Sequence, residues 1–477
     1  MYKAYVTYVT NIRPAANADR LNACEVFGNT TIIDKTITED TLVLYLPSDG
    51  QISVEFGEKN NLFRRKDDAG NNVGGFIDPD KRNITAIRLR GNRSDGLVLP
   101  ISCLNYCYAH GDASIELRAG DVIDGLVNGH EICCKYIPRS KTRRGTVAEG
   151  NRTRKKKIPT APLFKEHADT EQLAYNLGAF KAGDEIEITL KMHGTSQRTG
   201  YLPVLQGYKR TFKDWLCRRQ GKPVYDWGYV SGTRRVVLDS YEGGFYGNNE
   251  FREQHSKTFE GKLWKGETIY YEVVGFTTSG APIMGDASNK KLNDKEFIKQ
   301  YGEITRFSYG CEPYGHTCSP CICEEACGAP QSDIYVYRMT MTNPDGEVVE
   351  YTLDFMRYRC EQMAVKCVPV FWRGFIPKYE DIMYVDKNEN DIPDKDEVTY
   401  TKPIDAGEWI MNLANKFIDG PDPIGKTHLR EGVVVRIVNR PKFAAYKSKS
   451  FEFKVLEGIA KVEAEAPDME EAQEVIE

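Results

Sequence analysis

The sequence predicts an α+β protein in which a small N-terminal β-barrel precedes a larger part of antiparallel sheets with flanking helices. Two observations predict this order. Roughly the first 135 residues consist of short strand-like segments separated by Gly, Asn, Asp and Pro, without a long helical pattern. From about Leu163 onward, strand-sized alternating segments are mixed with helical ones. With 477 residues, 40% of them hydrophobic, the chain is long enough for two or three domains.

The N-terminal region, which we place at 1–136, contains candidate strands at 3–10, 41–46 and 84–90. The strings PAANADRL, LVLYLPSDG and IRLRGNRSDGLVLP resemble those of an OB-type barrel. Such barrels bind nucleic acids, but also sugars and proteins. The resemblance therefore implies an OB-like nucleic-acid-binding domain.

The charge of the chain is unevenly distributed. The formal net charge of -5 argues weakly against a polyanionic partner, because such partners require a basic surface. Cations nevertheless dominate 139–157, within a segment that we interpret as a basic linker at 137–162. An acidic tail follows at 461–477. The linker could lie along a nucleic acid or be solvated, and both interpretations stay open.

No segment resembles a membrane span or a secretion signal. The longest apolar runs, 269–276 and 432–438, are strand-sized and far shorter than the ~20 residues that cross a bilayer. The N-terminus lacks a basic stretch followed by an apolar core. We therefore expect a cytoplasmic protein without a membrane partner. The oligomeric state is not indicated.

Five of the 13 cysteines crowd one short segment, 311–327, and the irregular spacing of the whole set argues against a disulfide scaffold. The five are Cys311, Cys318, Cys321, Cys323 and Cys327. Cys318 and Cys321 have the CxxC spacing of zinc sites, and four thiolates can close a tetrahedron around the ion. The segment is interpreted as a structural zinc site or, alternatively, as a reduced loop without metal.

The string EIEITLKMHGTS predicts a strand that presents a lysine at its end. Ile186, Ile188 and Leu190 alternate with polar residues, so the strand should end beside Lys191 and a turn at Gly194. A lysine amine can attack the α-phosphorus of ATP once it has lost a proton, and burial or neighbouring cations favour that neutral form. By itself the KxxG string is far more often a surface turn.

The segments that follow in order resemble the covalent nucleotidyltransferase superfamily of DNA ligases, RNA ligases and capping enzymes. KMHGTS resembles the nucleophile motif of its RNA ligases, with His193 where DNA ligases usually have Asp. YYEVVG, YVYRMT, EGVVVR and YKSK then resemble motifs III, IIIa, IV and V. The matching residues are Lys191, Ser196, Glu272, Tyr337, Glu431, Lys447 and Lys449. The resemblance implies a nucleotidyltransferase domain of the ATP-grasp-like DNA/RNA ligase type at 163–460.

Each of these residue types suits the role that the resemblance implies. Lys447 and Lys449, two residues apart on a strand, can both face the charge of a phosphate group. Glu431 can hold Mg²⁺ or Mn²⁺ through water. Glu272 would accept hydrogen bonds from ribose hydroxyls, which offsets the cost of placing a carboxylate in an apolar strand. The nucleotide would also contact Ser196.

Two further positions belong to the expected nucleotide pocket. Tyr337 would stack on adenine. Arg234, or less clearly Arg235, follows VSGT and resembles the arginine that contacts ribose or the 3′-OH strand. Arg338 departs from the pattern, since many relatives have an acidic residue at this position.

The order of the parts resembles that of the fifth RNA ligase family in particular. An OB-like module comes first, and little chain follows motif V. This resemblance implies that Lys191 takes AMP from ATP, that AMP passes to a 5′-phosphate, and that a 3′-OH then displaces it. Nicked or broken RNA, including RNA-containing duplex, would be the substrate. The alternatives are a DNA ligase, a GTP-dependent capping enzyme, or an RNA-binding protein without activity.

The zinc interpretation predicts about one equivalent of zinc in the purified protein. We expect Cys321→Ser to lose most of it, because one ligand of the tetrahedron is removed. Elemental analysis of the wild type and of this variant measures the zinc content, with Cys134→Ser as the control outside the cluster. Less than half an equivalent in the wild type, unchanged in the variant, would exclude the site.

Overall fold

The computed structural model consists of two compact units, which we describe separately. The smaller comprises described residues within Met1–Glu149, Ala287–Ile304 and Phe451–Glu477, and the larger those within Gly150–Asp286 and Thr305–Ser450. The described residues are 2–15, 21–48, 50–65, 74–89, 92–136, 160–167, 170–217, 221–234, 236–238, 241, 246, 248–292, 294–315, 328–384, 398–457 and 460–462. Most of the predicted linker and acidic tail therefore lies outside them.

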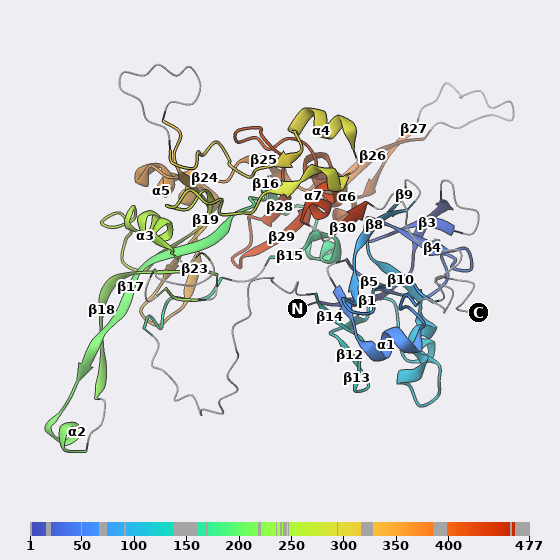
Figure 1. Ribbon diagram of the computed structural model, residues 1–477, viewed down its shortest axis with the longest axis horizontal. Helices are drawn as coiled ribbons and strands as arrows, with labels where there is room; N and C mark the ends of the chain where they lie inside the picture. The colour runs from blue at the N-terminus through green and yellow to red at the C-terminus, as the bar shows by residue number, and fades with distance from the viewer. Residues whose placement is uncertain are drawn as a thin grey trace. The chain divides into compact units, whose positions relative to one another are not determined.

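The larger unit contains two main sheets (Figure 1). The first has the order β15 (Glu171–Gln172), β29 (Ala444–Lys449), β28 (Gly432–Ile437), β16 (Glu185–Leu190) and β25 (Val370–Phe375). The second has the order β18 (Lys222–Gly232), β17 (Thr195–Lys209), β19 (Glu267–Gly275), β22 (Ser332–Thr342) and β23 (Val348–Glu350), with β24 (Lys366–Cys367) beside β22. Apart from the pairs β15–β29 and β22–β24, neighbouring strands in these sheets are antiparallel.

The strand predicted before Lys191 is confirmed as β16. Ile186, Ile188 and Leu190 are buried, as their alternation predicts. Helix α6 (Ala406–Ile418) packs on the neighbouring strand β28 and buries its own apolar side. The end of β16 is thereby held in place next to the residue expected to react.

One face of the second sheet is covered by two helices. Ile269, Tyr271 and Val273 of β19 form a core with Phe251 of α3 (Glu250–Lys257) and Met356 of α5 (Leu353–Met363). Side chains alternate between the two faces of a strand. Glu272, between two of these core residues, therefore belongs to the opposite face.

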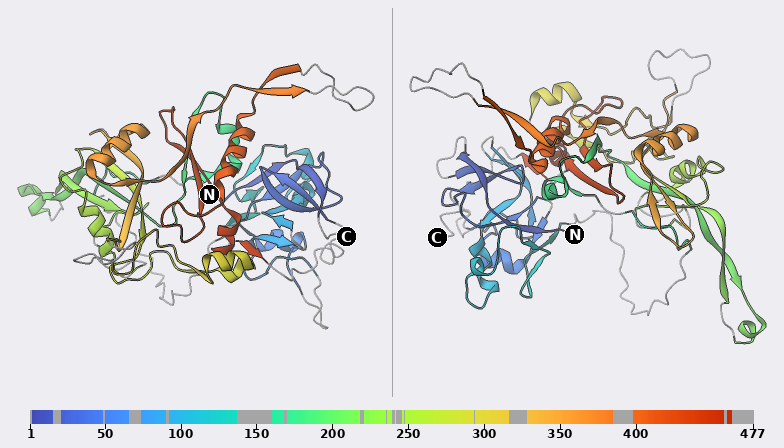
Figure 2. Two further views of the ribbon diagram at one scale, coloured as in Figure 1. Left: turned by 90° about the horizontal axis from the view of Figure 1, so that it is seen from above. Right: turned by 180° about the vertical axis from the view of Figure 1, so that it is seen from behind.

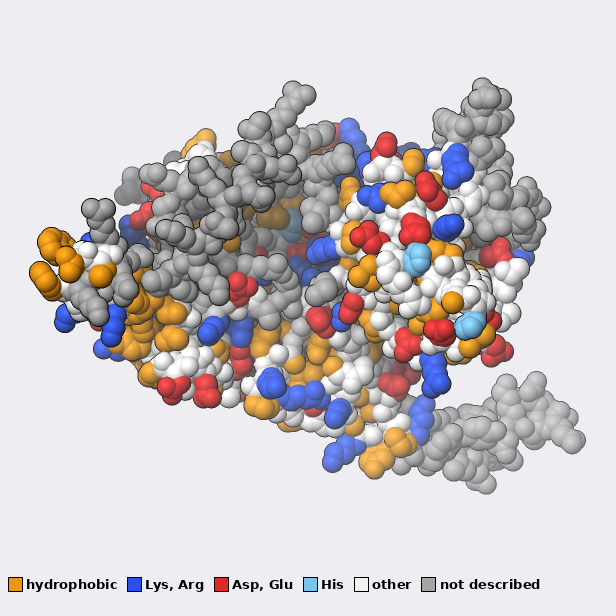
Figure 3. Space-filling view, turned by 90° about the horizontal axis from the view of Figure 1, so that it is seen from below, with side chains coloured by type: hydrophobic (Ala, Val, Ile, Leu, Met, Phe, Trp, Pro, Cys, Tyr) orange, Lys and Arg blue, Asp and Glu red, His pale blue; other side chains and the backbone are white. Residues whose placement is uncertain are grey.

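Two hairpins extend the larger unit. β26 (Tyr379–Tyr384) pairs with β27 (Val398–Pro403). β17 and β18 pair as far as Lys209 and Lys222, and the short helix α2 (Phe212–Leu216) lies at their far end. Figures 1 and 2 show this second hairpin projecting from its sheet, and Figure 3 shows hydrophobic side chains gathered at its tip.

The smaller unit is built mainly from short strands. One sheet has the order β10 (Leu97–Pro100), β5 (Val43–Leu46), β1 (Ala4–Thr7) and β11 (Val122–Ile123). Three sheets have three strands each, in the orders β14 (Cys133–Lys135), β6 (Gly50–Ile52), β7 (Asn83–Ile84); β2 (Thr10–Pro14), β3 (Leu21–Val26), β4 (Asn29–Asp34); and β30 (Ala460–Val462), β8 (Ala86–Leu89), β9 (Asn92–Ser94). The strands β12 (Leu126–Val127) and β13 (His130–Glu131) form a pair. The helices of this unit are α1 (Val54–Lys59), α4 (Lys295–Tyr301) and α7 (Phe451–Leu456). Two further short strands are β20 (Ala287–Ser288) and β21 (Ile304–Thr305).

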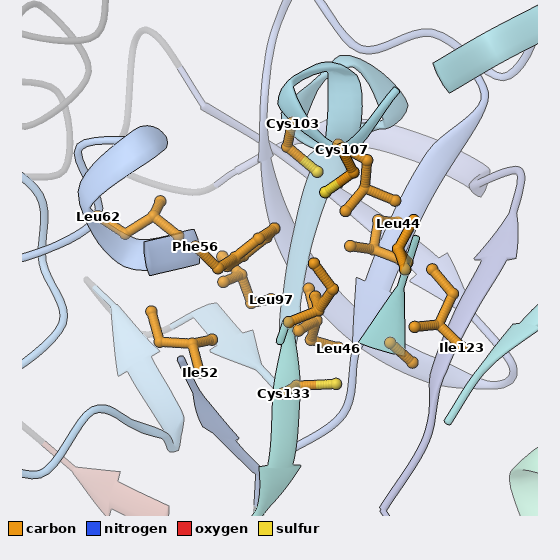
Figure 4. Close-up of a cluster of buried hydrophobic side chains, with 14 of the residues drawn as sticks. Leu44, Leu46, Ile52, Phe56, Leu62, Leu97, Cys103, Cys107, Ile123 and Cys133 are labelled. Carbon is orange, nitrogen blue, oxygen red and sulfur yellow. The ribbon is translucent and has the colours of Figure 1, made fainter. Parts of the chain in front are cut away.

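The predicted strands in this unit are present but shorter and more broken than expected. The pairing among its described residues gives separate small sheets rather than one closed barrel. A compact apolar core nevertheless joins several of them (Figure 4). Leu44 and Leu46 of β5 face Phe56 of α1 and Ile123 of β11 in this core.

Among the helices that the structure describes, none combines the length and apolar character needed to cross a membrane.

Candidate active site

Three strand ends meet beside Lys191. β16 ends one residue before this lysine, and β28 begins one residue after Glu431. The backbone N–H of Lys191 donates to the carbonyl of Gly432 at 3.0 Å. In the next pair of strands Gly432 lies opposite Lys449, the last residue of β29. Antiparallel register therefore brings together two lysines and a glutamate that are far apart in the sequence.

These three side chains form a buried ionic cluster, which we call the lysine–glutamate cluster: Lys191, Glu431 and Lys449. Oε1 of Glu431 accepts a hydrogen bond from Nζ of Lys191 at 2.6 Å and lies 2.8 Å from Nζ of Lys449. The Glu431 side chain is only 2% exposed. Burial alone would raise its pKa, but Lys191, Lys449 and His193 hold the pKa well below its ordinary value. Glu431 is therefore an anion in the folded protein.

The second carboxylate oxygen of Glu431 has a different environment. Oε2 is buried and has no hydrogen-bond partner among the described residues. Nδ1 of His193 lies 3.6 Å away, too far for a good hydrogen bond. A buried anionic oxygen with open lone pairs fits a hard divalent cation or its bound water.

His193 is held by contacts on its backbone and ring. Its N–H donates to Oη of Tyr309 at 2.8 Å, and its ring meets Phe307 edge to face at 4.5 Å. Tyr309 also packs edge to face on His428. This aromatic support fixes the chain between Lys191 and Gly194.

Two glycines permit the close approach of these segments. A Cβ on Gly194 would lie 2.5 Å from the carbonyl oxygen of Val273 and 2.8 Å from Cγ of Glu272. Gly432 has a φ of +147°, and a Cβ there would lie 2.0 Å from the carbonyl oxygen of Ser448. The glycines of the KxxG and EGVVVR strings are thus explained by backbone packing.

A second group of polar side chains lies on the face of the second sheet opposite α3 and α5. Ser196 of β17 pairs with Glu272 of β19, which pairs in turn with Tyr335 of β22. A register shift in the β19–β22 pair leaves Tyr337 out of the regular pairing. The hydroxyls of Ser196 and Tyr337 lie 2.9 Å apart and share a hydrogen bond. Serine, glutamate and tyrosine are thereby gathered next to Gly194.

Glu272 has the opposite electrostatic character to Glu431. Burial raises the pKa of Glu272 to about 7, and the negative charge of Glu431 adds to the rise. Lys191, Arg234 and Arg252 oppose it. Two carboxyl groups in one site therefore have pKa values displaced in opposite directions, which is characteristic of functional sites.

The structure also locates the remaining predicted residues that it describes. Lys447 lies two residues before Lys449 on β29, so both belong to the same strand face. Arg234 follows the end of β18 and is exposed, and its charge acts on Glu272 and Tyr337. Arg235 lies outside the described residues.

Only one cysteine of the predicted zinc site, Cys311, lies within the described residues. It is buried, and burial raises the pKa of its thiol to about 12. Cys318, Cys321, Cys323 and Cys327 lie outside the described part of the chain. The zinc site stays a prediction.

Two buried arginines near the site were not identified from the sequence. Arg252 of α3 donates to the carbonyl of Ser196 at 3.1 Å and also to the Thr195 hydroxyl. Arg198 of β17 donates to the carbonyl of Thr233 at 3.0 Å. Both side chains brace strands that carry predicted residues. Sequence periodicity gives no signal for them, because their partners lie far away in the chain.

Arg338, the departure from the family pattern, has its own partners. It forms an ion pair with Glu350 and a 2.8 Å contact with Nδ1 of His167, and its guanidinium lies 4.4 Å from the ring centre of Phe443. The His167 ring lies 5.4 Å from that of Tyr337. Arg338 therefore contacts His167, whose ring lies next to that of Tyr337, and Glu350 compensates the charge of Arg338.

The fold is shared with solved RNA ligase structures. A Naegleria gruberi RNA ligase with PPi has a TM-score of 0.52 and 16% identity, covering 94% of this chain and 97% of that one. One mutant of that ligase with ATP and Mn has a TM-score of 0.51 and 15% identity, covering 95% of this chain and 98% of that one. A second mutant with ATP and Mn also has a TM-score of 0.51, with 16% identity, covering 96% of this chain and 99% of that one. No family model and no curated protein matches the chain.

The raised pKa of Glu272 predicts a pH-dependent stability. Between the ordinary value of 4.5 and about 7, the folded state keeps a proton that the unfolded state releases, so stability falls as pH rises. Glu272→Gln removes this loss. We expect the variant to match the wild type near pH 4.5 and to be more stable by about 1–3 kcal/mol at pH 8.

Thermal unfolding of both proteins across this pH range measures the difference. Glu260→Gln, an exposed position on the same unit, is the control and should give a constant offset. Parallel pH profiles for the wild type and Glu272→Gln would contradict the assignment.

Proposed function

We propose that the protein is an ATP-dependent RNA ligase that carries AMP covalently on Lys191. The observation that carries this proposal is the lysine–glutamate cluster at the ends of three adjacent strands. A lysine amine is held there beside an anion and a second cation, next to Ser196, Glu272 and Tyr337. The shared fold with RNA ligases supports the same function. Their low identity to this chain makes the site itself the stronger argument.

The chemistry begins with the Nζ lone pair of Lys191. In the structure this nitrogen donates to Glu431, and only a neutral amine can attack phosphorus. The neutral amine then attacks the α-phosphorus of ATP, an N–P bond forms, and the bond to pyrophosphate breaks. Lys449 and Lys447 supply positive charge where the phosphates gain negative charge.

The remaining steps move AMP onto RNA and then release it. An oxygen of a 5′-phosphate attacks the lysyl-AMP phosphorus, which breaks the N–P bond and returns the electron pair to Lys191. A 3′-OH next attacks the activated 5′-phosphorus, and AMP leaves. The product is a phosphodiester bond, so nicked or broken RNA with a 3′-OH and a 5′-phosphate is the proposed substrate.

Residues of the second sheet would bind the nucleoside. Tyr337 offers a flat ring for adenine, with its hydroxyl oriented by Ser196. Glu272 would accept hydrogen bonds from the ribose hydroxyls, and donors there would stabilise its ionised form. Arg234 extends from the same region with donors for ribose or for the 3′-OH strand.

Glu431 would hold Mg²⁺ or Mn²⁺. Its anionic state and the open Oε2 fit such an ion, which would supply positive charge to stabilise the phosphates. The small sheets of the N-terminal unit would bind RNA through an OB-like surface. The five cysteines of 311–327 would hold zinc. We place the protein in the fifth RNA ligase family because the OB-like unit precedes the nucleotidyltransferase motifs.

Covalent labelling tests the nucleophile. Incubation with α-³²P-ATP and Mg²⁺ should label the wild type, whereas Lys191→Arg should show no label, because a guanidinium stays protonated and cannot attack. This variant keeps the positive charge next to Glu431. Lys378→Arg, an exposed position, is the matched control and should label normally. Undiminished labelling of Lys191→Arg would overturn the assignment.

The same assay with GTP, followed by sealing of nicks with RNA or DNA on the 3′ side, separates the alternatives. Preference for GTP favours a capping enzyme, and equal sealing of DNA favours a DNA ligase. RNA binding without any labelled protein would favour a binding protein.

Glu431→Gln tests the anion at the centre of the cluster. The amide keeps the shape but loses the charge that both lysines contact, so we expect the single-turnover labelling rate to fall by about 100-fold or more. Glu260→Gln serves as the exposed control. A Glu431→Gln rate within about threefold of the wild type would show that the charge has no catalytic role.

A further inference from the structure

The hairpin formed by β17 and β18 extends well beyond the sheet to which it belongs. β19 pairs with β17 only from Thr195 to Gly200, whereas β17 and β18 pair with each other as far as Lys209 and Lys222. At about 3.3 Å per residue, the nine residues after Gly200 reach roughly 30 Å. We call residues 201–217 and 221–229, with α2 at the tip, the hairpin arm.

The tip of the arm exposes three large apolar side chains in one short helix. Phe212, Trp215 and Leu216 are 78%, 65% and 68% exposed. The rings of Phe212 and Trp215 lie 5.7 Å apart. Figure 3 shows hydrophobic atoms gathered at this end of the molecule, with Lys and Arg beside them. Single exposed apolar residues are ordinary, but a cluster indicates an interaction surface.

The arm is also basic. Residues 209–222 of the sequence include six Lys or Arg residues and one acidic residue. Lys209, Arg210 and Lys222 are exposed. This charge stands out in a chain whose formal net charge is -5. The positive charge of the tip is complementary to that of a polyanion.

An aromatic row connects the tip with the rest of the larger unit. Tyr201 lies opposite Tyr229 with their rings stacked at 4.7 Å, and Trp227 lies 5.8 Å from Tyr201. The exposed Lys265 lies 5.3 Å from the centre of the Trp227 ring. Tyr225 follows two residues further along the same strand face. Flat rings next to cations are the groups on which single-stranded bases stack.

The strands of the arm continue into the candidate active site. β17 starts at Thr195, directly before Ser196, and β18 ends at Gly232, two residues before Arg234. The aromatic row lies on the face of the sheet that α3 and α5 cover, opposite the face of Ser196, so it is connected to the candidate active site through the backbone of the arm and not along one surface. An apolar basic tip could also enter a membrane surface, but that function would not require aromatic rings along the length of the arm.

We propose that the hairpin arm binds single-stranded RNA at a distance from the ends to be joined. Phe212 and Trp215 stack on bases, and Lys209 and Lys222 contact phosphates. The inference deepens the proposed RNA ligase function and rests on it for the identity of the polyanion. The arm thus contributes affinity for RNA that the nucleotide pocket does not provide.

The test measures RNA affinity of the full-length protein without ATP. Fluorescence anisotropy of a labelled, 5′-phosphorylated single strand of about 20 nucleotides gives the Kd for the wild type and two double variants. We expect Phe212→Ser with Trp215→Ser to weaken binding by about tenfold or more. Lys209→Glu with Lys222→Glu should weaken it similarly and reduce the dependence of log Kd on log salt by about one to two.

Matched controls keep the size of each change but move it away from the arm. Phe375→Ser with Val349→Ser replaces two other exposed apolar residues of the same unit, and Lys378→Glu with Lys416→Glu makes the same change in charge. Both controls should bind RNA as the wild type does. Thermal unfolding confirms that the arm variants are folded.

The outcomes separate this inference from the proposed function. Unchanged RNA affinity in both arm variants would overturn the inference that the arm binds RNA. Co-sedimentation with anionic phospholipid vesicles that is lost in Phe212→Ser with Trp215→Ser, while RNA affinity stays unchanged, also overturns it in favour of a membrane surface. Reduced RNA affinity in the arm variants supports it even if the wild type forms no lysyl-AMP, and that combination would refute only the ligase proposal.

Discussion

The candidate site depends on one buried carboxylate, that of Glu431, which contacts two lysines from neighbouring strand ends. Taking a carboxylate out of water is costly unless opposite charge compensates it. Lys191 and Lys449 provide that charge, and each is less than a quarter exposed. The register of β16, β28 and β29 makes this compensation possible, because it fixes all three residues at one edge of the sheet.

The two carboxyl groups of the site serve different tasks because their surroundings differ. Cations surround Glu431 and keep it ionised, whereas Glu272 lies half-buried in an otherwise apolar strand, and desolvation raises its pKa to about 7. An ionised group suits a metal ion and the phosphates, and a group that titrates near neutrality responds to hydrogen-bond donors of a ligand. The electrostatics thus divide the site into a phosphate side and a nucleoside side.

Much of the site could be predicted from the sequence, but its supports could not. Lys191, Glu431 and Lys449 were identified from the order of short motifs, and the strand before Lys191 from alternation. Arg252 and Tyr309 gave no such signal, because each acts through a partner far away in the chain. Similarly, the short N-terminal strands were predicted, whereas their division into separate small sheets was not.

The sequence by itself determined which residues carry charge and where strands alternate. These are local properties, set by side-chain chemistry and by the two-residue period of a strand. Only the tertiary structure decided that Oε1 of Glu431 meets both lysines, that Oε2 stays open, and that β17 and β18 continue past their sheet as an arm. Contacts between residues up to 240 positions apart depend on strand register, which local patterns do not encode.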